Sequence, residues 1–343
     1  MDQHPTTPGQ GLTRPPHLRP GDHIAVVAPS GPIEPERLTA GCAILRSWGL
    51  RVTVAPHVLD THPALGYLAG TDADRAADLR NAWLDPTVDA VICARGGYGV
   101  HRIVDLLDWT AMRAAAPKPF IGFSDVSSLH EAFARHLGLA TLYGPLAAGA
   151  SFISDGPTAE HLRRTLFDPA ATTVLTSPTA APLVPGRARG ITAGGCVHVL
   201  AAERGTPAAR PSYEGSILVL EDVNEHPYQL DRLLTQFLRS GALDGVAGIA
   251  LGSWEGCGRP ERVREVMLDR LGGLGIPVLW ELGFGHCPST LTVPLGIPAL
   301  LDADAGTLTL DLPALDLPAL DRPVPDRPVP DPPVLDRPAT DPR

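Results

Sequence analysis

Short apolar runs alternate with amphipathic segments throughout the first half of the chain. The runs are rich in β-branched residues, which predicts five strands. They cover residues 23–28, 51–55, 88–93, 120–123 and 140–143. The segments between them repeat apolar residues at helical spacing, as at Leu38, Cys42 and Leu45. Strands that alternate with helices in this way favour a parallel sheet with helices on both faces.

A second set of runs follows a stretch rich in Thr, Ala and Pro. Apolar runs at 217–220, 246–251 and 277–282 predict strands, and the amphipathic segments 227–240 and 261–271 predict helices. We therefore expect an α/β chain with a parallel-sheet domain similar to flavodoxins and amidotransferases, followed by a smaller α/β domain. The expected boundaries are 21–168 for the first domain, 169–186 for a linker and 187–310 for the second domain.

Both ends of the chain have a different sequence pattern. Residues 1–20 carry no regular pattern and are expected to form a flexible leader. From residue 311 an Asp recurs at every fifth position up to 341, with frequent Pro between. Pro blocks helices and sheet ladders, and Asp stays solvated, so we expect residues 311–343 to be a disordered tail.

Charge and cysteine content exclude several classes of protein. The net charge is −10, so no basic surface for nucleic acid is expected. No run of 18 apolar residues predicts a membrane span, and the first 22 residues lack the apolar core of a secretory signal. Five Cys without a CxxC pair are typical of a reduced cytoplasmic protein without a zinc ribbon. We expect neither a metal nor a cofactor.

Three unusual turns follow predicted strands of the first domain. They are Pro29-Ser30-Gly31, the segment 95–99, and Gly122-Phe123-Ser124-Asp125. Ligands of parallel sheets bind beyond the carboxyl ends of the strands, where these turns lie. Ser124 suits a nucleophile held on a tight turn, although a helix cap is a common role for such a serine. The glycines at 96–99 suit a cradle for an anion, or simply a turn that needs positive φ.

The second domain contributes an acid and a histidine. Glu221 and Asp222 end a predicted strand, and His286 lies in an irregular turn. Ser124, Glu221 and His286 thus occur in the order serine, acid, histidine, and nucleophilic catalysis needs these three types together. A solvated strand end and a surface histidine would explain the same residues, and spacing alone does not show that the three meet.

Five segments together resemble the LD-carboxypeptidase family of serine peptidases, which includes muramoyl-tetrapeptide carboxypeptidases and microcin C immunity peptidases. They occur in the family's order and span roughly residues 18–310. The segments are GDHIAVVAPSGPI (21–33), ARGGYGVHRIVDLLDW (94–109), FIGFSDVSSLH (120–130), LVLEDVNEHPYQLDRLLTQF (218–237) and GFGHCPSTLTVPLG (283–296).

The resemblance implies a catalytic triad of Ser124, Glu221 and His286 in a cleft between the two domains. It implies an oxyanion hole formed by the backbone N–H groups of Gly97 and Asp125. Homodimers are common in the family. Arg95 is the nearest obvious cation for a substrate carboxylate, because guanidinium binds carboxylate bidentately. Arg95 and Tyr98 are accordingly expected to bind substrate, although a structural role for Arg95 explains it nearly as well.

The expected activity is hydrolysis of an amide between an L-centre and a C-terminal D-amino acid in a small cell-wall peptide, through an acyl-enzyme. The compact connection between Ser124 and Glu221 favours this over a microcin C-like immunity peptidase. Cys196 stands where the family usually has Asn. The resemblance therefore does not predict the local hydrogen bonding or the substrate preference at this position. An α/β-hydrolase esterase is disfavoured, because Val126 occupies the second Gly of G-x-S-x-G. A non-catalytic peptide-binding protein is the remaining alternative.

Overall fold

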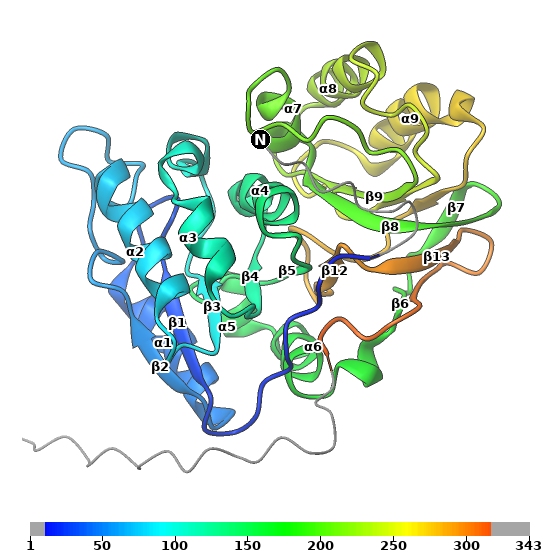
Figure 1. Ribbon diagram of the computed structural model, residues 1–343. Coiled ribbons are helices and arrows are strands. Elements are labelled where there is room, and N and C mark those ends of the chain that lie inside the picture. Colours follow the sequence, from blue (N-terminus) through cyan, green and yellow to red (C-terminus); the bar gives the residue numbers. More distant parts are fainter. Residues whose placement is uncertain (1–10, 317–343) are drawn as a thin grey trace, which may run out of the picture.

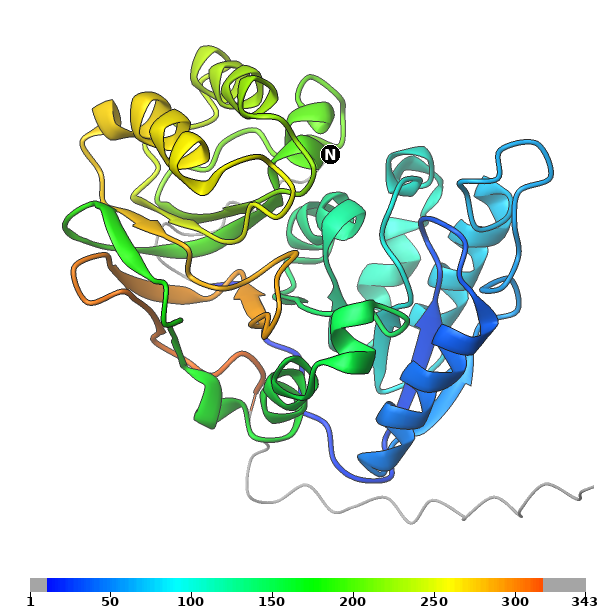
Figure 2. The ribbon, with the colours of Figure 1, turned by 180° about the vertical axis from the view of Figure 1, so that it is seen from behind.

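The computed structural model describes residues 11–316 as two α/β units that lie side by side (Figures 1 and 2). The first unit is built on a six-stranded sheet with the order β12-β5-β4-β3-β1-β2. Strands β1 to β5 are parallel, and β12 is antiparallel to β5. The strands are β1 (His23–Val27), β2 (Arg51–Val54), β3 (Ala90–Cys93), β4 (Phe120–Gly122), β5 (Thr141–Tyr143) and β12 (Val293–Leu295).

Helices cover both faces of this sheet, as the alternating pattern predicts. One face packs against α2 (Asp72–Leu84), α3 (Trp109–Ala114) and α4 (Ser127–Leu137). The other face packs against α1 (Pro35–Ser47), α5 (Ala150–Ser154) and α6 (Gly156–Phe167). Strands β1, β3, β4 and β5 are buried along their whole lengths, which explains their continuous apolar runs.

The second unit contains an eight-stranded mixed sheet with the order β6-β14-β13-β8-β9-β10-β11-β7. Strands β8 to β11 are parallel, and the outer strands pair antiparallel. The strands are β6 (Val174–Leu175), β7 (Ala181–Val184), β8 (Arg187–Cys196), β9 (Ser216–Glu221), β10 (Gly248–Leu251), β11 (Val278–Trp280), β13 (Pro298–Asp302) and β14 (Thr307–Leu310).

One face of the second sheet is covered by helices and the other faces the first unit. The helices α7 (Val197–Glu203), α8 (Pro227–Arg239) and α9 (Pro260–Leu271) bury their apolar sides on it. On the opposite face, Ile217 and Val219 belong to the same apolar core as Tyr143 of the first unit. The two units therefore share a continuous core, which fixes the position of one relative to the other.

Segments without a predicted strand contribute to both sheets. Strands β8, β13 and β14 are such segments, and so are the expected linker and strand β12. The expected linker 169–186 contains β6 and β7, the two edge strands of the second sheet. Strand β12, from the second half of the sequence, completes the sheet of the first unit. Both are short and lie next to Pro residues, so a local pattern of β-branched residues is weak there.

The described parts of the two ends also differ from the expected flexible leader and tail. Residues 11–20 run extended across the molecule, where Leu18 is 2% exposed and Thr13 pairs with Leu139. Ala314 and Leu315 are each 1% exposed, and Asp316 pairs with Pro16. Burial of apolar side chains thus orders segments that lack a regular pattern. The rest of the predicted leader and tail, residues 1–10 and 317–343, lies outside the described residues.

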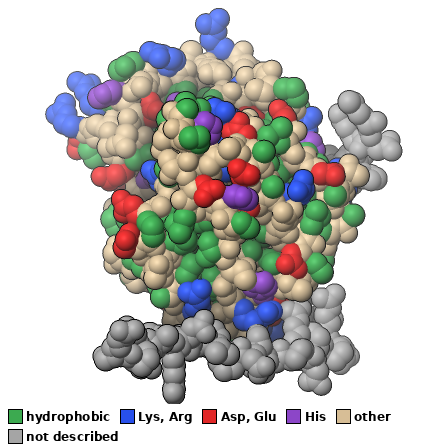
Figure 3. Space-filling model, turned by 90° about the vertical axis from the view of Figure 1, so that its left-hand side faces the viewer, with side chains coloured by type: hydrophobic (Ala, Val, Ile, Leu, Met, Phe, Trp, Pro, Cys, Tyr) green, Lys and Arg blue, Asp and Glu red, His purple; other side chains and the backbone are tan. Residues whose placement is uncertain are grey.

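The surface mixes charges of both signs on the face seen in Figure 3. The Lys and Arg side chains on this face are dispersed among acidic and apolar side chains and form no continuous basic area there. Between residues 11 and 316, no helix is both long and apolar enough to cross a bilayer.

Candidate active site

Ser124 occupies a strained turn between β4 and α4. Its φ is +66°, in the left-handed region that costs a non-glycine residue about 1–2 kcal/mol. Its backbone N–H donates to the Tyr143 hydroxyl at 3.3 Å. The N-cap positions of the following 3₁₀ turn and of α4 are Phe123 and Val126, and neither makes a side-chain cap. Strain of this kind is typical of functional positions, so the turn favours the nucleophile over the helix-cap interpretation.

The three unusual turns of the first domain meet at this point. The Gly31 N–H donates to the Gly96 carbonyl at 3.1 Å. The Asp125 carboxylate is buried and accepts the Val100 N–H at 3.0 Å. The buried Arg75 guanidinium donates to the carbonyls of Pro29 and Gly99. These bonds hold the turns together beyond the carboxyl ends of the strands, where the parallel sheet predicts a site.

Glu221 and His286 form a hydrogen-bonded pair. Glu221 ends β9 with 0% of its surface exposed, and its Oε2 is 2.7 Å from Nδ1 of His286. The same Oε2 accepts the His286 backbone N–H at 3.2 Å, and Oε1 accepts the Tyr143 hydroxyl at 2.5 Å. The carboxylate thus fixes both the ring and the backbone of His286. The second ring nitrogen, Nε2, is not bound by Glu221.

The pKa of His286 is raised above its ordinary value. Burial by itself lowers this pKa, because it disfavours the charged ring. The negative charge of Glu221 and its hydrogen bond to the ring outweigh that effect. A histidine whose pKa is raised in this way is a stronger base and stabilises the imidazolium that forms when it takes a proton.

A cavity of about 1020 Å³, here called the Ser124 cavity, contains both Ser124 and His286 in its wall. Ser124 comes from the first unit and His286 from the second, so the cavity lies at the junction of the two. Gly97 and Arg95 also line it, while Asp125 lies buried beside it. The structure therefore pairs the acid with the histidine and places the serine in the wall of the same cavity as the histidine.

Arg95 and Tyr98 have different surroundings. Arg95 lines the Ser124 cavity, is exposed, and donates from Nη1 to the Pro32 carbonyl at 3.0 Å. Tyr98 is 45% exposed and is not among the residues that line the cavity. The centroid of its ring lies 6.0 Å from that of Tyr67, and substrate binding by Tyr98 stays a prediction. The left-handed glycines Gly97 and Gly99 on either side set the direction of this turn.

Tyr143 is the site residue that sequence reasoning missed. Its hydroxyl connects the Glu221 carboxylate to the backbone of Ser124. Tyr143 is 1% exposed, and burial followed by the Glu221 charge raises its pKa well above the ordinary value, so the hydroxyl stays a donor. Its place at the carboxyl end of β5 is the signal that could have identified it.

Cys196, at the position where the resemblance predicts Asn, lies near Tyr143 and Glu221. Its thiol is 3.5 Å from Asp222 Oδ1, and its backbone N–H donates to the Ser127 hydroxyl at 2.9 Å. Asp222 also accepts the His198 N–H at 2.7 Å. Burial and the neighbouring Glu221 charge raise the pKa of Asp222 to about 6. Cys196 therefore takes part in local hydrogen bonding and is not among the residues that line the Ser124 cavity.

Two family models match successive parts of the chain. Residues 24–144 match the LD-carboxypeptidase N-terminal domain, and residues 189–301 match the LD-carboxypeptidase C-terminal domain. A Streptomyces coelicolor protein with a provisional carboxypeptidase name is 64% identical over 304 residues, 89% of this chain and 98% of that protein. The murein tetrapeptide carboxypeptidase of Pseudomonas aeruginosa is 34% identical over 292 residues, 82% of this chain and 93% of that protein.

Among solved structures, the microcin C7 self-immunity protein MccF has a TM-score of 0.78 at 24% identity. The match covers 89% of this chain and 100% of MccF, and it concerns the fold alone. Both domain matches, in the same order and over most of the described residues, lead to one conclusion: the chain belongs to the LD-carboxypeptidase family.

Proposed function

We propose that this carboxypeptidase is a serine peptidase that removes a C-terminal D-amino acid from a small cell-wall peptide by cleaving its amide bond to an L-centre. The observation that carries the proposal is the contact of the buried Glu221 carboxylate with His286 at 2.7 Å, with His286 and Ser124 in the wall of one cavity. The P. aeruginosa relative, named a murein tetrapeptide carboxypeptidase, supports the choice of substrate.

In this mechanism His286 takes the proton of the Ser124 hydroxyl, and Oγ of Ser124 attacks the carbonyl carbon of the scissile amide. The backbone N–H groups of Gly97 and Asp125 stabilise the oxyanion, each such donor being worth about 10²–10³ in rate. His286 then returns the proton to the leaving D-amino acid, and the acyl-enzyme is hydrolysed by water that the same histidine deprotonates. Glu221 orients His286 and stabilises its charged form.

The Ser124 cavity offers two guanidinium groups to a substrate with a free C-terminal carboxylate. Arg37 and Arg95 line the cavity together with the acids Glu34 and Asp155, and guanidinium groups bind carboxylates with paired hydrogen bonds. A peptide bound in this way presents its last amide bond to the nucleophile. A small peptide is then the only ligand that the proposal requires. The cytoplasmic location and the homodimer are separate expectations and stay predictions.

Product analysis with matched peptides tests the proposal. The expected result is release of D-alanine from a muropeptide tetrapeptide, detected by mass spectrometry, and no release from the same peptide ending in L-alanine. Turnover of simple esters without turnover of the tetrapeptide would instead indicate an esterase. Turnover of an aminoacyl-nucleotide conjugate alone would indicate an immunity peptidase, and binding of the peptide without any turnover would indicate a non-catalytic protein.

Gly285→Ala is expected to lower kcat/KM by about 100-fold or more, since a shift near 1 Å in a catalytic group has effects of this size. At this residue φ is +94°, and a Cβ would lie 2.4 Å from Glu221 Oε2, so the carboxylate must move.

Gly275→Ala is the matched control, because φ there is +71° and nothing lies within 4 Å of a Cβ. Both variants carry similar backbone strain, which thermal melting measures, but only Gly285→Ala should lose activity. Equal activity of the two variants would contradict the role given to Glu221.

A further inference from the structure

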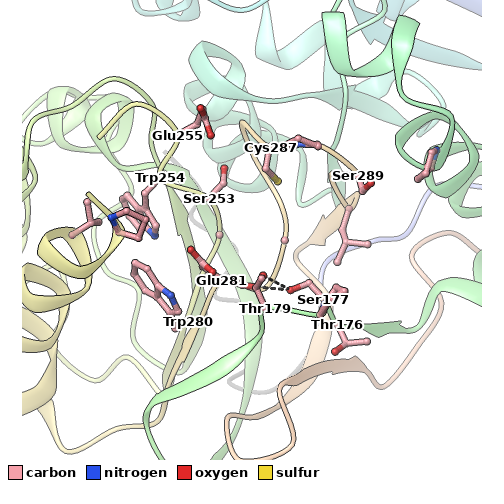
Figure 4. A pocket seen from close by; sticks show the side chains of 18 of the residues that line it. Thr176, Ser177, Thr179, Ser253, Trp254, Glu255, Trp280, Glu281, Cys287 and Ser289 are labelled. Atoms are coloured by element: carbon pink, nitrogen blue, oxygen red, sulfur yellow. Dashed lines mark hydrogen bonds between the residues drawn. The ribbon is translucent and has the colours of Figure 1, made fainter. Parts of the chain in front are cut away.

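A second cavity of about 680 Å³ adjoins the Ser124 cavity. It is called here the Trp cavity, after Trp254 and Trp280 in its wall (Figure 4). Cys287 and Pro288 line both cavities, so the loop that carries His286 forms part of the partition between them. A side chain of a ligand bound near Ser124 would have to pass this loop to enter the Trp cavity.

The Trp cavity carries negative charge without a cation to balance it. Glu255 and Glu281 belong to its lining, and none of the described lining residues is Lys or Arg. The lining also contains His161, whose Nδ1 accepts the Thr292 N–H at 3.0 Å and whose pKa burial lowers to about 4. His161 is thus neutral at pH 7, and no ion pair among the described residues involves Glu281.

Glu281 is held at the cavity wall by its backbone. Its φ is +53°, in the region that non-glycine residues rarely adopt. The Ser177 hydroxyl donates to its carbonyl oxygen at 2.6 Å, which keeps this conformation in place. Burial raises the pKa of Glu281, because a partly buried carboxylate loses hydration. A bound cation would compensate for that loss.

The two tryptophans add a surface that attracts cations. Their rings are nearly parallel at 9°, with centroids 6.5 Å apart, and the two residues are 8% and 6% exposed. Indole faces bind ammonium groups through the negative potential of the ring. Trp254 Nε1 is buried without a hydrogen-bond partner, and such a donor normally has one. A ligand with an acceptor beside its cation would satisfy it.

We propose that the Trp cavity binds a primary ammonium group on an alkyl side chain of the substrate, with Glu281 as its counter-ion and Trp254 and Trp280 as its aromatic wall. This inference rests on the proposed peptidase function. It also orients the peptide. The Ser124 cavity has Arg37 and Arg95 beside its two acids and can accept the terminal carboxylate, whereas the described lining of the Trp cavity has acids and no Lys or Arg and disfavours it.

Kinetics with two matched peptides test the assignment. Both end in D-alanine; the preceding residue is lysine in one and Nε-acetyl-lysine in the other. For the protein without substitutions, acetylation of the peptide's lysine is expected to raise KM about tenfold, with little change in kcat. This is the scale of a desolvated cation–π contact. Glu281→Gln should abolish the difference in KM, while Glu261→Gln, an exposed acid of α9, should preserve it. Equal KM values for both peptides, or a difference that persists in Glu281→Gln, would overturn the proposal.

A binding experiment separates this proposal from the peptidase function. Tryptophan fluorescence of Ser124→Ala is titrated with 1,5-diaminopentane, which requires no turnover. A saturable change that disappears in Ser124→Ala/Glu281→Gln is expected, even if neither peptide is hydrolysed. A change that persists in the double variant, the absence of any saturable change, or saturation by N-acetylglucosamine alone would refute an ammonium site.

Discussion

Ser124→Ala is expected to abolish release of D-alanine from a tetrapeptide, with kcat lowered about 10⁶-fold, as for other nucleophilic serines. The variant loses the attacking oxygen and keeps the cavity, so peptide binding should persist in a calorimetric titration. Mass spectrometry of the unmodified protein after treatment with a fluorophosphonate should locate the label on Ser124.

Two further variants separate loss of chemistry from loss of structure. Ser128→Ala removes a buried hydroxyl of α4 that has no partner, and its activity should match that of the unmodified protein. Ser124→Gly should be inactive yet melt at a higher temperature than Ser124→Ala, because glycine adopts a φ of +66° without steric cost. Turnover by either Ser124 variant near the normal rate would rule out this nucleophile.

Glu221→Gln is expected to lower kcat about 10⁴-fold, the scale seen when the acid of a triad becomes an amide. The amide no longer stabilises the charged His286 ring and favours the wrong tautomer. The pH profile of kcat/KM should change as well, since its acid limb reports protonation of the free base. Activity falls as pH drops through the raised pKa of His286, and without the Glu221 charge this limb should move to lower pH.

Glu214→Gln provides the control for Glu221→Gln, because Glu214 is exposed just before the same strand. It should leave both kcat and the acid limb in place. Circular dichroism confirms that both variants are folded. A kcat for Glu221→Gln within tenfold of normal, with an unchanged acid limb, would show that the carboxylate is not the partner of the catalytic base.

Sequence reasoning succeeds where a pattern reflects local burial. Strands β1 and β3 are buried along their whole lengths, so uninterrupted apolar runs identify them. Strand β8 is harder to recognise, because Gly190, Gly194 and Gly195 interrupt its pattern. Those glycines are required by close approach: a Cβ on Gly194 would lie 2.3 Å from the Val219 carbonyl oxygen of the neighbouring strand. Only the paired sheet reveals such a constraint.

The amino-acid sequence by itself determines the alternation of strands and helices, and it places Ser124, Glu221 and His286 next to predicted strand ends. Tertiary structure decides which of these groups meet. Glu221 and His286 are 65 residues apart, and Tyr143 is 78 residues from Glu221. Tyr98 turns to Tyr67 although its neighbour Gly97 lines the cavity. Periodicity records only whether a residue is buried, whereas hydrogen bonds between distant segments depend on how two sheets pack against each other.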